Sequence, residues 1–158
     1  MKYNWILWLT ILLPFVACKK ENEQSEVPSI ALESISKTEV VQFKDSIIIL
    51  LTFIDGDGDL GRQHPDDNSL YIKDERLTNA ERYHLPPLLD ESKDGETSQG
   101  SIRVFVPSLF LLGNGGDEVT RLSIKVQDQA GNWSNEVVTP TITTVSYTHL
   151  TLPTIYSV

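Results

Sequence analysis

An apolar run at residues 47–54 leads directly into a loop of alternating aspartate and glycine, FIDGDGDLG at residues 53–61. The run is short and rich in isoleucine, which predicts a central β-strand buried on both faces rather than a helix. Aspartate and glycine next to each other are typical of tight turns. The chain is therefore expected to fold around a strand that ends at Asp55, Asp57 and Asp59.

Further short, alternating or β-branched segments predict more strands, and no convincing amphipathic helix lies between them. Residues 28–43 predict a first strand that switches sheets, and residues 108–112 predict a short helical turn. Pro140 places the last strand at an edge or a bulge. The expected strands are at residues 28–36, 38–43, 47–54, 69–73, 101–107, 119–127 and 136–143. About seven strands with turns between them predict an all-β fold, an antiparallel β-sandwich.

The N-terminal segment has the pattern of a secretory signal. Lys2 is followed by an uncharged apolar run from Trp5 to Ala17, shorter than the about 20 residues of a membrane span. The sequence FVAC at residues 15–18 is similar to the lipobox of bacterial lipoproteins, which implies that Cys18 is lipidated. We therefore expect a signal peptide at 1–17 and a flexible tether at 18–27. The alternative for Cys18, the only cysteine, is a buried thiol.

Two motifs carry a resemblance to a known family. The pattern F-x-D-x-D-G-D-L-G occurs at residues 53–61, and D-x-A-G-N-x-S-N-x-V-x-T-P occurs at residues 128–140. Together they resemble Bacteroidetes-type outer-membrane lipoproteins with a single immunoglobulin-like domain. The resemblance implies an immunoglobulin-like β-sandwich over residues 28–144, lipid-anchored to the bacterial outer membrane on its cell-surface or periplasmic face. It implies no assigned activity.

The C-terminal segment has a different character. The sequence VSYTHLTLPT at residues 145–154 resembles a translated sequencing-library transposase adapter. On this interpretation residues 145–158 are a non-native tail. The alternative is a final β-strand, because the composition suits one.

The aspartate loop is the candidate metal site. Asp55, Asp57 and Asp59 have the alternate spacing of a calcium loop, although strands rather than helices flank them. In an immunoglobulin-like sandwich the loop between the last two strands lies at the same pole, which brings Asp128 and Asn132 to face this loop. The hypothesis is a bound calcium ion that cancels the repulsion between the carboxylates. The alternative is that these aspartates only shape turns.

Charge and composition bound the remaining functions. The net charge of −9 repels phosphate backbones, so we expect no nucleic-acid partner. A hydrolase that uses the loop aspartates would need a carboxyl in apolar surroundings, which an exposed glycine-rich loop is not expected to supply. We therefore expect no catalysis, but a binding or structural module with an unknown protein or glycan ligand. Trp133 either stacks on a sugar, as in a glycan-binding accessory lipoprotein of a polysaccharide uptake system, or closes the end of the sandwich.

Overall fold

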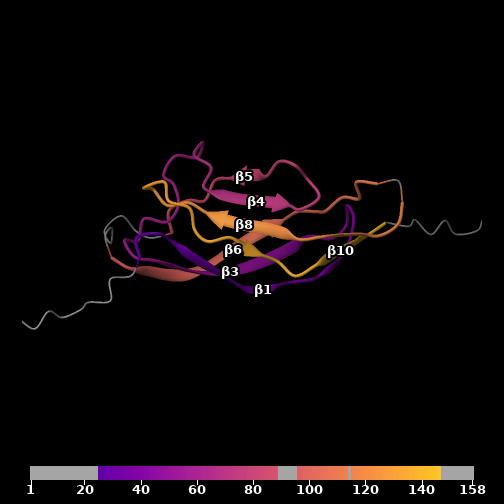
Figure 1. Cartoon of the computed structure of the whole chain (residues 1–158), viewed down its shortest axis with the longest axis horizontal. Helices are drawn as coiled ribbons and strands as arrows, with labels where there is room; N and C mark the ends of the chain where they lie inside the picture. Colours follow the sequence, from indigo (N-terminus) through magenta and orange to yellow (C-terminus); the bar gives the residue numbers. More distant parts are fainter. Residues whose placement is uncertain (1–24, 89–95, 114, 147–158) are drawn as a thin grey trace, which may run out of the picture.

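The computed structural model describes residues 25–88, 96–113 and 115–146. This part of the chain is all-β, with ten strands in three sheets and no helix, and so no helix that could cross a membrane. Figure 1 shows two layers of strands along the long axis of the molecule. The expected signal peptide, Cys18 and most of the expected tether and tail lie outside the described residues.

The first sheet has the order β1-β3-β6 and is antiparallel throughout. Its strands are β1 (Ser29–Ile35), β3 (Ile47–Asp55) and β6 (Ser98–Val106). Along β3, alternate residues from Ile47 to Phe53 are buried, whereas Thr52 and Ile54 are exposed. The prediction that this strand is buried on both faces is therefore wrong, because one face packs on the core and the other meets solvent, as is usual in antiparallel sheets.

The second sheet has the order β5-β4-β8-β9. It consists of β4 (Leu70–Asp74), β5 (Glu81–Tyr83), β8 (Leu122–Val126) and β9 (Val137–Val138). Its inward residues Ile72, Ile124 and Val126 belong to the same apolar core as Ile49 and Leu51 of the first sheet. The arrangement is that of a β-sandwich, which confirms the predicted all-β class.

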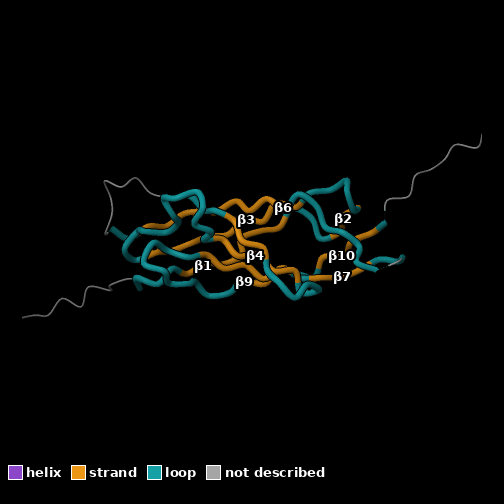
Figure 2. Tube along the Cα trace, turned by 90° about the horizontal axis from the view of Figure 1, so that it is seen from above, coloured by secondary structure: helices purple, strands orange, loops and turns teal. Residues whose placement is uncertain are grey.

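A third, smaller sheet lies at one end of the sandwich (Figure 2). It combines β2 (Glu39–Val41), β10 (Ile142–Val145) and β7 (Glu118–Thr120), with β2 parallel and β7 antiparallel to β10. Val145, the first residue of the segment interpreted as a tail, pairs with Val41. The predicted sheet switch of the first strand is confirmed, since β1 and β2 lie in different sheets.

Two predicted strands are each divided between two sheets. The segment 119–127 changes sheet at Arg121, between β7 and β8. The segment 136–143 breaks around Pro140, which lacks the N–H that a central strand needs, and becomes β9 and β10. The predicted helical turn at residues 108–112 is wrong, because these residues have no helical structure.

A side-chain amide joins the edges of the two main sheets. Asn135, just before β9, accepts a hydrogen bond from the Ile30 N–H and donates one to the Ile30 carbonyl, each at 2.8 Å. These are the two bonds that a neighbouring strand would make with Ile30. Asn135 therefore extends the pairing of β1 toward β9 where the two layers meet.

Candidate metal centre

Asp55 is the last residue of β3, and its side chain lies in the interior. Strand alternation points its side chain to the same side as Leu51 and Phe53, and Asp55 has no exposed surface. Gly58, with a φ of 74°, then turns the chain back on itself. As a result, Asp55, Asp57 and Asp59 each place one carboxylate oxygen within 4.8 Å of the others.

The carboxylates in this cluster are short of donors. Both oxygens of Asp55 and the Oδ1 atoms of Asp57 and Asp59 are buried without a hydrogen-bond partner. The other oxygen of Asp59 accepts a bond from the Ala130 N–H at 3.1 Å. A buried carboxylate without partners costs several kcal/mol unless it is protonated or paired with a cation. The cluster is thus built in a way that favours a positive ligand.

The loop between β8 and β9 lies against the aspartate loop, as the sandwich topology predicts. Leu60 forms a β-bridge with Asp128, and the Gln129 N–H donates to the Asp59 carbonyl at 3.1 Å. Asp128 is fully buried, and its two carboxylate oxygens accept bonds from the backbone and side-chain amides of Asn132 at 2.7 and 2.9 Å. Asp128 and Asn132 therefore satisfy each other, and the unpartnered oxygens belong to the trio Asp55, Asp57 and Asp59.

Burial and mutual repulsion change the acidity of the cluster. Burial raises the pKa of Asp55 to about 6, with further contributions from the charges of Asp57, Asp59 and Asp128, while the Leu60 amide opposes the shift. Burial also raises the pKa of Asp59 to about 6, followed by the charges of Asp128 and Asp57. Residues 55–61 are all buried or half-buried, so the expectation that this loop is exposed is wrong. The charged form of these groups opposes folding in the absence of a cation.

The donor set indicates which cation suits the cluster. Three carboxylates on a glycine-rich backbone offer only oxygen ligands, which are typical of hard divalent ions. Calcium in particular accepts irregular, flexible sets of carboxylate and carbonyl oxygens. Asp55, Asp57 and Asp59 are the residues that would hold it, and the bound charge would also neutralise the field of Asp128.

Trp133 lies beside Tyr71 and Lys125, whose positions in β4 and β8 alternate with the inward residues of the second sheet. Its ring meets the Tyr71 ring edge-on, with centroids 6.3 Å apart. The Lys125 ammonium is 5.0 Å from the Tyr71 centroid and 5.8 Å from that of Trp133. Closure of the sandwich end by Trp133 and stacking of a sugar on Trp133 both stay predictions.

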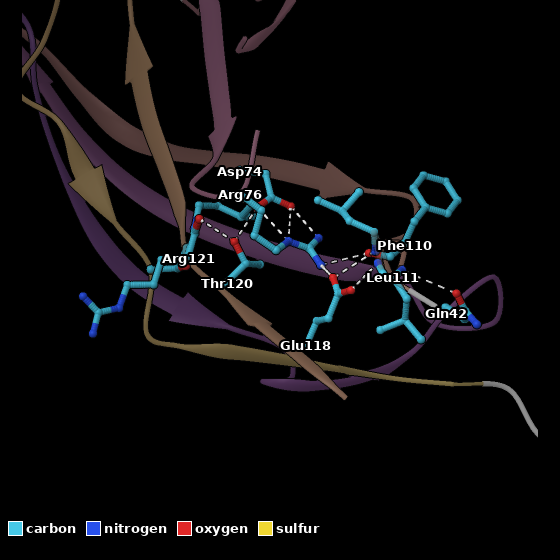
Figure 3. A network of polar contacts seen from close by, with 12 residues as sticks. Gln42, Asp74, Arg76, Phe110, Leu111, Glu118, Thr120 and Arg121 are labelled. Carbon is cyan, nitrogen blue, oxygen red and sulfur yellow. Dashed lines mark hydrogen bonds and ion pairs between the residues drawn. The ribbon is translucent and has the colours of Figure 1, made fainter. Parts of the chain in front are cut away.

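A polar network that the sequence did not indicate lies at the opposite end of the sandwich (Figure 3). Arg76 donates to both oxygens of Asp74, with Nη2 at 2.6 Å from Oδ2, and to Glu118 Oε2 at 2.7 Å. The Thr120 hydroxyl also donates to Asp74, and Arg76 Nη1 donates to the Phe110 carbonyl at 2.9 Å. Each of the two carboxylates has an ion pair with Arg76 and further hydrogen-bond donors, so neither of them lacks a partner as Asp55 does, and this network is structural. An Asp-x-Arg spacing within a charged segment is too common to have revealed it.

Burial raises the pKa of the Asp74 carboxyl, but the hydrogen bonds from Arg76 and Thr120 outweigh burial and leave the pKa below 3.8. The backbone amides of Leu112 and Gly113, together with Arg76, lower the pKa of Glu118. The two acidic groups at this end are therefore stable as anions, in contrast to those of the aspartate loop.

Comparisons of the chain with protein-family models, with curated proteins and with solved structures gave no match.

Proposed function

We propose that the chain is a lipid-anchored, immunoglobulin-like module of the bacterial outer membrane, with a binding or structural role and a calcium ion in the Asp55 loop. The immunoglobulin-like part is supported by strand order. The sheets β1-β3-β6 and β5-β4-β8-β9 match the A-B-E and C′-C-F-G orders of that fold. The two motifs that suggested the family, at residues 53–61 and 128–140, contain the loops that meet at the Leu60–Asp128 bridge, and the second motif continues through β9 to Pro140.

The observation that carries the calcium part is the Asp55 side chain, which is fully buried with neither oxygen hydrogen-bonded. Turn-shaping aspartates accept bonds from nearby backbone amides, as Asp128 does from Asn132. The Leu60 amide is near enough to oppose the rise in the pKa of Asp55, but it does not complete a hydrogen bond to either oxygen. A cation would supply the missing partner and would hold the end of β3 to the loop that directly follows it, because all three unpartnered aspartates lie within residues 55–59.

The lipid-anchor part is supported by the N-terminal sequence and by where the chain enters the domain. The Gly56 N–H donates to the Ser25 carbonyl at 2.9 Å, so the described chain begins beside the aspartate loop. Figure 1 shows the described part of the chain beginning and ending at opposite ends of the sandwich. An anchor at Cys18 would accordingly hold the end of the sandwich with the aspartate loop nearer to the membrane and the third sheet farther from it.

The direct test is thermal unfolding of the full chain in calcium and in chelator. An ion that binds only the folded state, present at a hundredfold excess over Kd, stabilises it by about 2.7 kcal/mol. We expect a rise in Tm of several degrees in calcium, since about 1 kcal/mol shifts the Tm of a domain of this size by a few degrees. Identical unfolding curves in the two conditions would leave only the turn-shaping interpretation.

Asp55→Asn tests the site itself, because its effect on the stability of the protein should differ between chelator and calcium. In chelator, the variant should be at least as stable as the wild type, because it removes a buried charge and its amide can donate to the neighbouring carboxylates. In calcium, it should lose the stabilisation that the wild type gains. Asp66→Asn is the matched control, because it removes an exposed carboxylate that lies a few residues farther along the chain. An equal calcium response in Asp55→Asn and the wild type would exclude this site.

A further inference from the structure

The two main sheets differ in width. The second sheet has four strands and the first has three within the described residues. On the outer strand β5, Glu81 and Tyr83 pair with Ile72 and Leu70, and directly opposed residues of neighbouring strands point to the same side. Both side chains therefore point toward the first sheet. Tyr83 is nevertheless 41% exposed and Glu81 is exposed, because β5 has no described strand opposite it.

Part of the space opposite β5 is an apolar cavity. It has a volume of about 210 Å³ and lies between the β4–β5 hairpin and the end of β6. Several of its lining residues are apolar and only partly covered, notably Leu77, Phe105 and Phe110, with Phe105 60% exposed. Exposed apolar side chains gathered around a cavity commonly mark a contact surface.

The strand beside the cavity has an unused edge. Among the described residues β6 pairs only with β3, although it is nine residues long. The sequence of β6 contains no proline, and Arg103 is its only charged residue, so the usual protections of an exposed edge are nearly absent. Such an edge offers a row of backbone N–H and C=O groups to an added strand.

We propose that the free edge of β6 and the adjoining cavity form a docking groove for an extended strand of another protein. The added strand would be the fourth of the first sheet and would cover Tyr83, Leu77 and the cavity. Its inward residues should be apolar at alternate positions. One of them should be basic, because Glu81 is exposed within the groove and the whole chain carries a net charge of −9.

A second copy of this chain fits the groove less well. Two β6 strands related by a two-fold axis through Ile102 would pair Ser98 of one copy with Val106 of the other. The inward residues brought to the cavity would then be Ser98 and Gly100, which are too small and polar to fill it. The occupant that suits the cavity is a strand with larger apolar side chains.

The test uses a synthetic peptide with the nine-residue length of β6, in which valine and threonine alternate and one inward residue is lysine. A second peptide has the same composition with its apolar residues grouped. We expect the full chain to bind the alternating peptide more tightly by about tenfold, measured by fluorescence anisotropy. Binding should slow amide hydrogen exchange within Ser98–Val106.

Variants locate the contact. Tyr83→Glu should weaken binding of the alternating peptide by about tenfold or more, and Glu81→Lys should shift the preference toward a peptide with glutamate in place of lysine. Val138→Glu is the control, because Val138 is 43% exposed on β9, at the other edge of the same sheet. The proposal fails if neither peptide binds, if Tyr83→Glu binds like the wild type, or if β6 is protected by self-association instead.

Discussion

Gly61 holds the loop after the aspartates against residues 85–88. Its φ is 98°, and a Cβ atom placed on it would lie 2.8 Å from the carbonyl carbon of Pro86. The Arg62 N–H donates to the Leu85 carbonyl at 2.8 Å, which fixes the approach of the two segments. No side chain fits this position without moving the backbone.

We expect Gly61→Ala to destabilise the protein by roughly 2–5 kcal/mol, since it combines a strained φ with a steric clash. Gly116→Ala is the matched control, because Gly116 also has a positive φ, of 90°, but a Cβ atom there would have nothing within 4 Å. The control should lose only the conformational part, about 1 kcal/mol. Urea unfolding of both variants checks this, and equal losses would show that the contact with Pro86 does not matter.

At the residue scale, the sequence indicated which aspartates gather but not how their oxygens are used. The alternate spacing of Asp55, Asp57 and Asp59 was enough to predict a carboxylate cluster. Burial of Asp55 depends on the pairing of Asp55 with Ser98, a contact between residues far apart in the chain. Likewise, no local pattern shows that Asn132 already satisfies Asp128.

At the element scale, the Arg76 network ties the end of β4 to β7 and to the loop before it. Asp74 belongs to β4, Glu118 and Thr120 belong to β7, and both carboxyls have lowered pKa values. Groups with a lowered folded-state pKa bind fewer protons in the folded state than in the unfolded state. Their contribution to stability is therefore complete above the ordinary values of 3.8 and 4.5 and is lost as the pH falls below them.

Arg76→Met is expected to destabilise the protein by about 3 kcal/mol at neutral pH, because it leaves the buried Asp74 anion without its main partner. The loss should shrink as the pH falls through the lowered folded-state pKa values of Asp74 and Glu118, because below them both groups are protonated in the folded and the unfolded state. Urea unfolding across this range measures it. Arg121→Met, which changes an exposed arginine, should show neither the loss nor its pH dependence. A loss in Arg76→Met that is independent of pH would indicate packing alone.

The sequence did not predict the boundary between β7 and β8, because that boundary depends on which strands are neighbours. The alternation of buried residues continues across Arg121, yet β7 pairs with β10 and β8 pairs with β4 and β9. Alternation reports which face is buried and not which strand is the neighbour. The sheet switch at residues 36–38 was predictable because the apolar pattern itself is interrupted there.

In the whole molecule, the aspartate loop and the proposed docking groove lie at opposite ends of the sandwich. β3 and β6 are antiparallel, so the end of β6 beside the proposed groove is remote from Asp55 at the end of β3. The chain enters at Ser25, beside the aspartate loop. If Cys18 is the anchor, residues 18–25 reach at most about 28 Å, and the groove at Phe105 and Phe110 would face away from the membrane.

The anchor itself can be tested in a host that processes lipoproteins. Wild-type chain should incorporate labelled fatty acid and lose its signal peptide, because the apolar run ends at Cys18 and is too short to span the membrane. Cys18→Ala should remain an unprocessed precursor without label. Asp57→Asn is the control, since it changes the calcium loop and should leave labelling intact, which separates a failed anchor from a failed metal site. Equal labelling of Cys18→Ala and the wild type would refute the anchor and, with it, the orientation of the groove away from the membrane.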